Sequence, residues 1–315
     1  MTDDILRAVE ILRAGGLVAF PTETVYGLGA DASNAAAIAR LYAVKRRPVD
    51  HPVIVHFAAD ARAFEWVREV PEAARRLAAR FWPGPLTLIL KRATRVGDFV
   101  SGGQDTIGVR VPSHPVARAM LEVFGGGVAA PSANRFGKVS ATTAAHVREE
   151  LGQDVDLVLE GGPSEIGIES TIVDLSRGKP VMLRPGAISA AELEAVLAEP
   201  LGAADLRAPR APGTLERHYA PRTRMRLVAA HALDAEIAKA PGKAVLAFSR
   251  PDERVGYWLR MPREAQAYAR RLYAALREID TAGSDEILVE SPPEAPEWTA
   301  VLDRLRRATS PREGS

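Results

Sequence analysis

Short apolar runs alternate with longer amphipathic patterns between residues 17 and 185 of this 315-residue chain. The short runs are rich in β-branched residues and are bounded by glycine or proline, which is typical of strands, whereas apolar positions spaced by three and four predict helices. This alternation predicts an α/β domain in which helices cover a sheet. The predicted strands are 17–20, 52–57, 85–90, 106–111, 127–130, 155–160, 170–175 and 180–184. The predicted helices are 34–44, 71–82, 115–125, 142–152 and 189–198, the last opening with Ser189 and Glu192 at capping-box spacing.

The alternation stops at residue 200. The segment 200–223 contains four prolines and no periodicity, which predicts a linker, and a structureless linker of this length is unusual unless it is functional. Strand patterns at 225–230, 243–249 and 286–291 and helix patterns at 264–283 and 297–309 follow it. The sequence therefore predicts a domain over 1–199, a linker over 200–223 and a smaller α/β domain over 224–315.

Composition narrows the chemistry without identifying it. The chain has no cysteine, which excludes a thiol nucleophile, a thiolate metal site and disulfides. Its net charge of +1 gives only weak attraction to nucleic acid as a whole molecule. No apolar run reaches about eighteen residues, and the acidic start is unlike a signal peptide. A cytoplasmic location without membrane insertion is therefore expected.

The segment Gly27 to Ala32, GLGADA, satisfies the dinucleotide pattern G-x-G-x-x-A. A Rossmann fingerprint should follow a strand directly and be answered by an acidic residue that ends the next strand. Here residues 21–26 intervene, and Asp50 precedes the next predicted strand. NAD binding is therefore disfavoured, and the glycines are predicted to let the backbone turn closely past a neighbour.

Two polar segments allow two interpretations each. Thr22, Thr24 and Tyr26 would share one face if the segment were extended, but a polar turn is the favoured interpretation of this segment alone. In KRRP, the proline ends the preceding helix, so Lys45 and Arg47 either point together from a fixed loop or form a solvated charge run.

Further polar residues interrupt or follow apolar strands. His56 falls inside one strand, where a lone histidine is usually a hydrogen-bonded part of the core. Arg110 falls inside another, where it needs a protein carboxylate or a ligand anion as its partner. Collectively, arginines and small hydroxyl residues at successive strand ends predict a cleft for an anionic ligand. The other members of this set are Ser132, Asn134, Ser140, Thr142, Thr143, Ser170, Thr171 and Arg184.

The motifs PTETVYGLGADA, KRRP with HPVIVH, WPGPLTLIL, TIGVRVPSHP, APSANRFGKVSATT, ESTIVDL and LRPGAIS follow one another in this order. Their order over residues 5–195 resembles the YrdC-type threonylcarbamoyl-AMP synthases. APGTLERHYAP and the closing segment from ARRLYAALREID onward resemble the long, two-domain form of that family. The resemblance therefore covers nearly the whole chain.

The resemblance implies a twisted mixed sheet with flanking helices around a large open cavity, plus a smaller C-terminal α/β domain. It implies that L-threonine, bicarbonate and ATP give threonylcarbamoyl-AMP and pyrophosphate, with Mg²⁺ expected beside ATP. A separate transferase complex would then pass the threonylcarbamoyl group to the adenosine that follows the anticodon in tRNA. Tight nucleic-acid binding by this chain is not expected.

The resemblance also assigns roles by position in the motifs. Arg110 would hold the threonine carboxylate bidentately, and the linker would act as a lid that keeps water from the labile product. Lys45 and Arg47 would be the catalytic cations at the triphosphate. The residues implied around L-threonine are Thr24, His56, Arg110, Ala130 and Ser170. Those implied around ATP are Lys45, Arg47, His51, Thr106, Ser132, Ser140, Arg184 and Tyr219, and no metal-ligating side chain is implied.

Two positions depart from the family pattern, because His51 stands where asparagine is usual and Phe136 where a small serine is common. Two other functions also remain open for such a domain. One is a double-stranded RNA-binding module, which the near-zero net charge disfavours. The other is a carbamoyl-transfer enzyme, whose usual setting includes zinc-finger parts that a chain without cysteine cannot supply.

Overall fold

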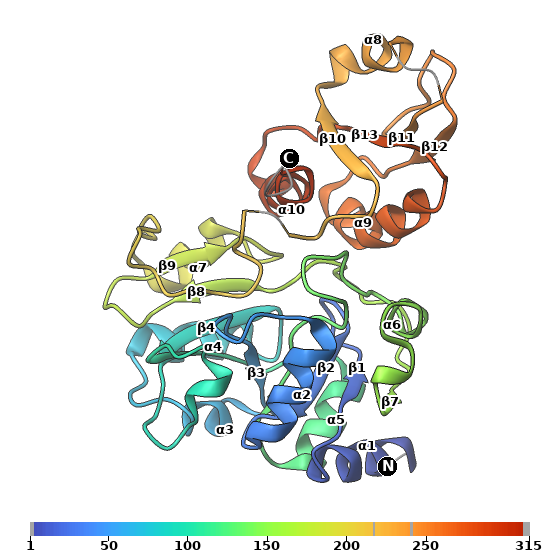
Figure 1. The fold of residues 1–315 in the computed structure, drawn as a ribbon. Helices are drawn as coiled ribbons and strands as arrows, with labels where there is room; N and C mark the ends of the chain where they lie inside the picture. The colour runs from blue at the N-terminus through green and yellow to red at the C-terminus, as the bar shows by residue number, and fades with distance from the viewer. Residues whose placement is uncertain (1–2, 217, 240–241, 311–315) are drawn as a thin grey trace. The chain divides into compact units, whose positions relative to one another are not determined.

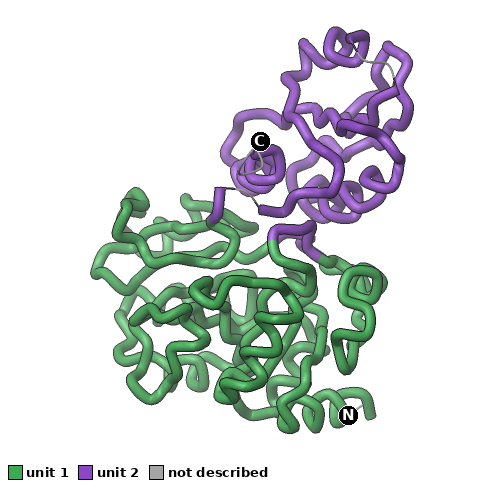
Figure 2. The backbone as a smooth tube through the Cα atoms, in the orientation of Figure 1, with its two compact units in different colours: residues 1–136, 141–165, 169–214 green, residues 137–140, 166–168, 215–315 purple. Residues whose placement is uncertain are grey.

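The structure is a computed structural model that describes residues 3–216, 218–239 and 242–310. The chain forms two compact units, drawn in separate colours in Figure 2. Unit 1 comprises Met1–Phe136, Ala141–Glu165 and Glu169–Thr214, and unit 2 comprises Gly137–Ser140, Ile166–Ile168 and Leu215–Ser315. Two short segments from the first two-thirds of the chain therefore pack with the C-terminal unit.

Unit 1 is built on a nine-stranded mixed sheet with the order β7-β1-β2-β6-β3-β5-β4-β8-β9 (Figure 1). Parallel and antiparallel pairs alternate irregularly; β3 and β5 are parallel, for example, while β4 and β5 are antiparallel. The predicted mixed α/β architecture is confirmed. The strands are β1 (Val18–Phe20), β2 (Gly27–Asp31), β3 (Ile54–His56), β4 (Leu86–Lys91), β5 (Thr106–Arg110), β6 (Val128–Ala129), β7 (Leu157–Val158), β8 (Thr171–Asp174) and β9 (Val181–Arg184).

Helices flank this sheet, and their ends follow ordinary capping chemistry. The Asn34 side chain accepts from the backbone N–H groups that open α2, and Ser189 with Glu192 forms the predicted capping box of α7. The helices of unit 1 are α1 (Asp3–Arg13), α2 (Ala35–Lys45), α3 (Asp60–Phe64), α4 (Glu72–Phe81), α5 (Pro115–Phe124), α6 (Ala144–Leu151) and α7 (Ala190–Leu197), with 3₁₀ turns at Asp98–Val100 and Gly152–Asp154.

The prediction that the glycines of GLGADA form a turn is wrong, because Gly27–Asp31 is strand β2, paired with both β1 and β6. The predicted close approach is nevertheless present. A Cβ on Gly29 would lie 2.9 Å from Phe20 Cε1 and 2.9 Å from Val128 Cγ1. The glycines therefore admit neighbouring side chains across a sheet, which is a recognised use of glycine within a strand.

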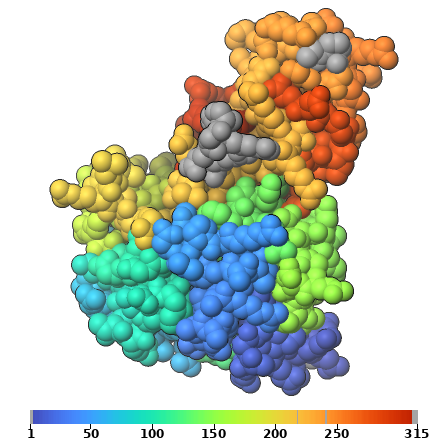
Figure 3. Space-filling model, viewed as in Figure 1, coloured from blue at the N-terminus to red at the C-terminus, as the bar shows by residue number. Residues whose placement is uncertain are grey.

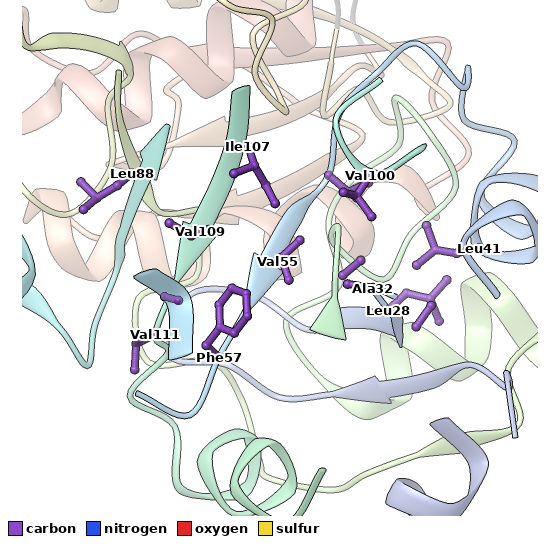
Figure 4. Packing of buried hydrophobic residues seen from close by; sticks show 14 of the residues in the cluster. Leu28, Ala32, Leu41, Val55, Phe57, Leu88, Val100, Ile107, Val109 and Val111 are labelled. Atoms are coloured by element: carbon purple, nitrogen blue, oxygen red, sulfur yellow. The ribbon is translucent and has the colours of Figure 1, made fainter. Parts of the chain in front are cut away.

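The two faces of the sheet differ in character. Alternate residues such as Val55, Leu88 and Val109 pack into the main apolar core (Figure 4). Because successive strand residues point to opposite faces, their neighbours His56, Thr87 and Arg110 lie on the other face. We call that second face the polar face. It also carries Ile54, Ile89 and Ile172, which form a small apolar cluster, Phe20, whose ring meets that of His56, and Arg184, the register partner of Ile172.

Unit 2 is a smaller α/β structure with a four-stranded parallel sheet of order β10-β13-β11-β12. Its helix α9, predicted as part of 264–283, buries one apolar side that includes Tyr268, Leu272, Leu276 and Ile279. Strand β12 and helix α8 were not predicted, because both are short and only partly apolar. The elements are β10 (Arg224–Val228), α8 (Leu233–Ala238), β11 (Ala244–Ala247), β12 (Tyr257–Arg260), α9 (Ala265–Asp280), β13 (Glu286–Glu290) and α10 (Thr299–Thr309), with 3₁₀ turns at Ala230–Ala232 and Pro296–Trp298.

In the part of the chain that the structure describes, no helix has the length and apolar character needed to cross a membrane.

Candidate functional site

Arg110, on β5, is held on the polar face by three hydrogen bonds from its guanidinium. Its Nη2 donates to Glu23 Oε1 (2.7 Å), its Nη1 to the Thr24 hydroxyl (3.0 Å) and its Nε to the Gly84 carbonyl (3.2 Å). The side chains of Arg110 and Glu23 are each only 4% exposed. The sequence predicts either a protein carboxylate or a ligand anion as the partner of Arg110. The structure provides the protein carboxylate, that of Glu23.

Thr24 reaches Arg110 from a buried turn. The Thr22 hydroxyl accepts from the backbone N–H groups of Thr24 and Val25 (3.2 Å each) and lies 2.8 Å from the Thr24 hydroxyl. Serine and threonine favour such turns because the hydroxyl replaces a backbone partner. Tyr26 points elsewhere, since its hydroxyl donates to the Gly162 carbonyl (2.9 Å). The favoured interpretation of this segment as a polar turn is thus confirmed, although the turn is buried.

His56 stands beside Arg110, its register partner across the parallel strands β3 and β5. Its ring meets Phe20 edge-on at 6.1 Å, and its Nδ1 is buried without a hydrogen-bond partner among the described residues. Burial, and secondarily the charge of Arg110, lowers the pKa of His56 to about 3. The imidazole is therefore neutral and its Nδ1 can serve an incoming ligand. The expectation of a hydrogen-bonded core histidine does not hold for this nitrogen.

Ser170 lies at the start of β8, between two partners. Its hydroxyl is 2.8 Å from the Thr87 hydroxyl and accepts from Arg184 Nη2 (3.1 Å). Arg184 also donates to the Ser170 carbonyl (3.0 Å) and, through Nη1, to the Pro212 carbonyl (2.8 Å). Because Leu88 pairs with Val109 across the antiparallel strands β4 and β5, Thr87 lies next to Arg110. The hydroxyls and both arginines consequently form one continuous polar row.

The charge run KRRP is divided between interior and surface. Lys45 and Arg47 are buried, while Arg46 is exposed and takes the left-handed conformation that ends α2 (φ 53°). Lys45 Nζ donates to the Ser132 carbonyl (2.5 Å) and to that of Asn134. Arg47 donates to the carbonyls of His51 (3.2 Å) and Pro52 (2.6 Å). Of the two interpretations, the solvated charge run is therefore wrong for Lys45 and Arg47.

The chain segments that supply these partners are neighbours in space. Figure 3 shows the blue segment that contains α2 bordering the green segments that follow β6 on the visible face of unit 1. The Phe136 N–H donates to the Lys45 carbonyl (2.8 Å), and the Arg47 guanidinium lies 5.2 Å from the centroid of the Phe136 ring. The His51 ring meets the same phenyl ring edge-on at 5.2 Å. His51 and Phe136 thus contact one another beside Arg47.

Other predicted site residues are distributed over both units. Ala130 follows β6 and donates its N–H to the Ile54 carbonyl (2.9 Å), and Thr106 begins β5. Ser140 and Tyr219 belong to unit 2. Tyr219 is 1% exposed, has φ 63° and stacks on Tyr273 with ring centroids 5.7 Å apart. The predicted threonine-binding residues, by contrast, are gathered on or beside the polar face of unit 1.

The predicted linker begins as part of unit 1. Gln104 accepts from the Arg210 N–H (2.7 Å) and donates to the Arg210 carbonyl (3.0 Å), while Ala211 joins the apolar residues of the polar face. Pro212 accepts from Arg184, as described above. Residues 210–212 therefore have defined partners although no helix or strand forms there.

Sequence reasoning missed Glu23 and Thr87 as members of this cluster. Glu23 could have been predicted as a site residue from the sequence, because it lies between two hydroxyl residues just before a buried strand. Thr87 carried none, since threonine is common in strands and its partner Ser170 lies 83 positions away.

Known families and solved proteins share this architecture and sequence. Residues 10–186 match the Sua5/YciO/YrdC family, described as "Telomere recombination", and residues 188–310 match "Threonylcarbamoyl-AMP synthase, C-terminal domain". The threonylcarbamoyl-AMP synthase of Pyrococcus abyssi is 39% identical over 97% of this chain and 94% of that protein. The Bacillus subtilis protein of the same name is 37% identical, with coverages of 98% and 93%. The crystal structure of P. abyssi Sua5 complexed with L-threonine matches with a TM-score of 0.89 and 38% identity over 97% of this chain and 94% of that one.

The nine-stranded mixed sheet followed by a smaller parallel sheet is the two-domain form of the YrdC-type α/β fold. The chain belongs to the threonylcarbamoyl-AMP synthase family, so the resemblance expected from the motif order is confirmed. Because the similarity to named synthases spans the full length, this assignment holds over an RNA-binding module or a carbamoyl-transfer enzyme.

Proposed function

We propose that this chain makes threonylcarbamoyl-AMP and pyrophosphate from L-threonine, bicarbonate and ATP. Its membership of the family supports the proposal, as does one structural observation. On the polar face, the neutral His56 imidazole, whose Nδ1 has no hydrogen-bond partner among the described residues, stands beside the Arg110 guanidinium, which makes three hydrogen bonds within the same ranges and so has N–H donors left for a ligand. Unpaired buried polar atoms are costly, so this pair favours a polar ligand with a carboxylate.

L-Threonine would occupy the polar face. Arg110 would hold the carboxylate, with the Thr24 hydroxyl beside it and the His56 Nδ1 accepting a hydrogen bond from the amino acid. The backbone at Ala130 and the hydroxyl of Ser170 would complete the site.

ATP would lie against the cations and hydroxyls at the ends of the neighbouring elements. Lys45 and Arg47 would face the triphosphate, which requires each to exchange a backbone carbonyl for a phosphate oxygen. The remaining predicted contacts are His51, Thr106, Ser132, Ser140, Arg184 and Tyr219. The last part of the linker, with Tyr219, would act as a lid that keeps water from the labile product.

The chemistry requires no covalent nucleophile. The neutral threonine amine would add to the carbon of bicarbonate, and one amine hydrogen would leave with the bicarbonate hydroxide as a single water, giving the carbamate; if bicarbonate first dehydrates to CO₂, the overall balance is the same. A carbamate oxygen would then attack the α-phosphorus of ATP, forming the P–O bond while the bond to pyrophosphate breaks. Such steps depend on alignment and on positive charge at the phosphates, which Lys45, Arg47 and Arg184 would supply.

Mg²⁺ is expected to enter with ATP. Within the ranges that the structure describes, no cluster of three or more histidine or acidic side chains could hold a metal ion. The cationic lining fits a metal carried by the phosphates, whose negative charge it would help to neutralise. The proposal also places the chain in the cytoplasm, upstream of a transferase complex that modifies tRNA and without tight nucleic-acid binding of its own.

The proposal is tested by measuring pyrophosphate release from ATP and bicarbonate with threonine, with serine and without an amino acid. Strong dependence on threonine, with threonylcarbamoyl-AMP identified by mass spectrometry, is the expected result. Pyrophosphate release that is equal in all three reactions would contradict the assignment of the amino-acid site.

A further inference from the structure

Glu23 is a buried carboxylate whose two oxygens have different partners. Oε1 accepts from Arg110 Nη2 (2.7 Å), and Oε2 accepts from the Ser113 backbone N–H (3.1 Å). The backbone donor anchors one end of the carboxylate to the segment that directly follows β5. The other end therefore presents a fixed acceptor to the guanidinium.

The arrangement determines which donors of Arg110 remain available. A guanidinium has five N–H donors, and the described contacts of Arg110 use one on Nε, one on Nη1 and one on Nη2. One donor on each Nη is left. Two such donors can bind both oxygens of a carboxylate at once, provided that the plane of the guanidinium is fixed.

A buried ion pair is weak support for a role in stability alone. Desolvation of both charges offsets much of their attraction, and well-packed apolar side chains of similar size often stabilise a protein equally well. In this chain the pair lies where the amino-acid carboxylate is proposed to bind. Its geometry, with three acceptors around one guanidinium, suits orientation of that group.

We propose that Glu23 is a positioning residue that orients Arg110 toward the carboxylate of L-threonine. The inference rests on the proposed function of the site. Glu23 does not touch the reacting atoms; it holds Arg110 through Nη2 and balances its charge while the site is empty. Loss of Glu23 should therefore weaken the use of threonine selectively and leave ATP almost unaffected.

The first experiment compares Glu23→Gln with the wild type in the pyrophosphate assay. Glutamine keeps the side-chain length but loses the charge and cannot accept from both Arg110 and Ser113 through two oxygens. The KM for threonine should rise about 10- to 100-fold, the range expected for one charged hydrogen bond. The KM for ATP and kcat should change by less than about threefold.

Asp156→Asn is the matched control. Asp156 accepts from Arg40 (2.6 and 2.9 Å) and from the Leu17 backbone N–H (2.7 Å), so it repeats the arginine-plus-backbone arrangement away from the polar face. This variant should lose some stability, measured by urea unfolding, and should retain the wild-type KM for threonine. Equal increases in the KM for threonine in both variants would overturn the proposal.

A double-mutant cycle with Arg110→Lys separates positioning from a general structural effect. Lysine cannot bind a carboxylate through a planar fork, so Glu23→Gln should add less than about threefold to the threonine KM in that background. An equal effect in both backgrounds would show that Glu23 does not act through Arg110. A lower threonine KM in Glu23→Gln would show that Glu23 repels the substrate instead.

Glu23→Asp replaces Glu23→Gln as the test variant if the glutamine variant does not fold. It keeps the charge but shortens the side chain by one methylene, so the threonine KM should still rise, and a wild-type value would overturn the inference. If the wild type is active and the Glu23 variants have an unchanged KM for threonine, only the positioning role of Glu23 is refuted. Wild-type protein without threonine-dependent pyrophosphate release would refute the proposed function as well.

Discussion

His56 and Arg110 are register partners on the parallel strands β3 and β5, and both side chains are buried on the same face of the sheet. Burial is the main cause, and the neighbouring guanidinium the second, of a His56 pKa lowered to about 3. The pair thus combines a permanent cation with an imidazole that stays neutral over the physiological range.

This relationship predicts how stability depends on pH. Below its ordinary pKa of 6.5, His56 binds a proton in the unfolded chain but not in the folded one. The free energy of unfolding should therefore fall as the pH decreases from about 6.5 toward 3. Between pH 7 and 4.5, the wild type should lose about 1 to 3 kcal/mol more than His56→Gln, as measured by urea unfolding. Parallel pH profiles of the two proteins would contradict a neutral buried His56.

Arg47→Ala should lower pyrophosphate release by about two or more orders of magnitude, because an oriented cation at the phosphates stabilises the charge that develops during transfer. Arg46→Ala is the control, since that side chain is the exposed neighbour in the same charge run. It should keep nearly full activity. Circular dichroism and thermal unfolding establish whether Arg47→Ala is folded, and near-normal turnover by the folded variant would argue against the phosphate role.

Gly29→Ala should destabilise unit 1 by about 1 to 3 kcal/mol, the usual cost of overpacking a core. The added methyl group would lie 2.9 Å from both Phe20 and Val128. Gly27→Ala is the graded comparison, because its nearest contact would be Ala130 Cβ at 3.2 Å. Urea unfolding should rank Gly29→Ala as the less stable variant, and the reverse order would contradict the strand packing.

Gln104→Ala should expose the start of the predicted linker to protease. The substitution removes the hydrogen bond that Gln104 donates to the Arg210 carbonyl and the one that it accepts from the Arg210 N–H, so local opening of this segment becomes easier. Trypsin should cleave after Arg207 or Arg210 faster than in the wild type, as followed by mass spectrometry. Gln153→Ala changes an exposed glutamine instead and should leave cleavage unchanged.

The strands and helices of unit 1 were largely predictable because each repeats its own apolar period. Gly27–Asp31 was the exception: glycines suggest a turn, and only the Phe20 and Val128 side chains opposite them explain a strand. In unit 2, β12 is short and partly exposed, so its strand state depends on pairing with β11. The hydrophobic pattern of a short segment cannot predict such pairing.

The candidate site was predictable as a set of residue types and motifs, but its internal bonds were not. The sequence indicated that Arg110 needs an anionic partner, yet Glu23 lies 87 positions away. Likewise, the sequence is compatible with a solvated charge run or a fixed loop at Lys45 and Arg47, because the carbonyls that bind Lys45 belong to residues 87 and 89 positions away.

By itself, the sequence determined the α/β class, the strand and helix periods, the absence of thiol chemistry and the motif order that marks the family. Tertiary structure alone decided that Glu23 accepts a hydrogen bond from Arg110, that His56 Nδ1 has no partner among the described residues, and that Lys45 and Arg47 are buried. The reason is physical. Periodicity and composition act over a few residues, whereas burial and hydrogen-bond partners depend on which distant strands the sheet brings together.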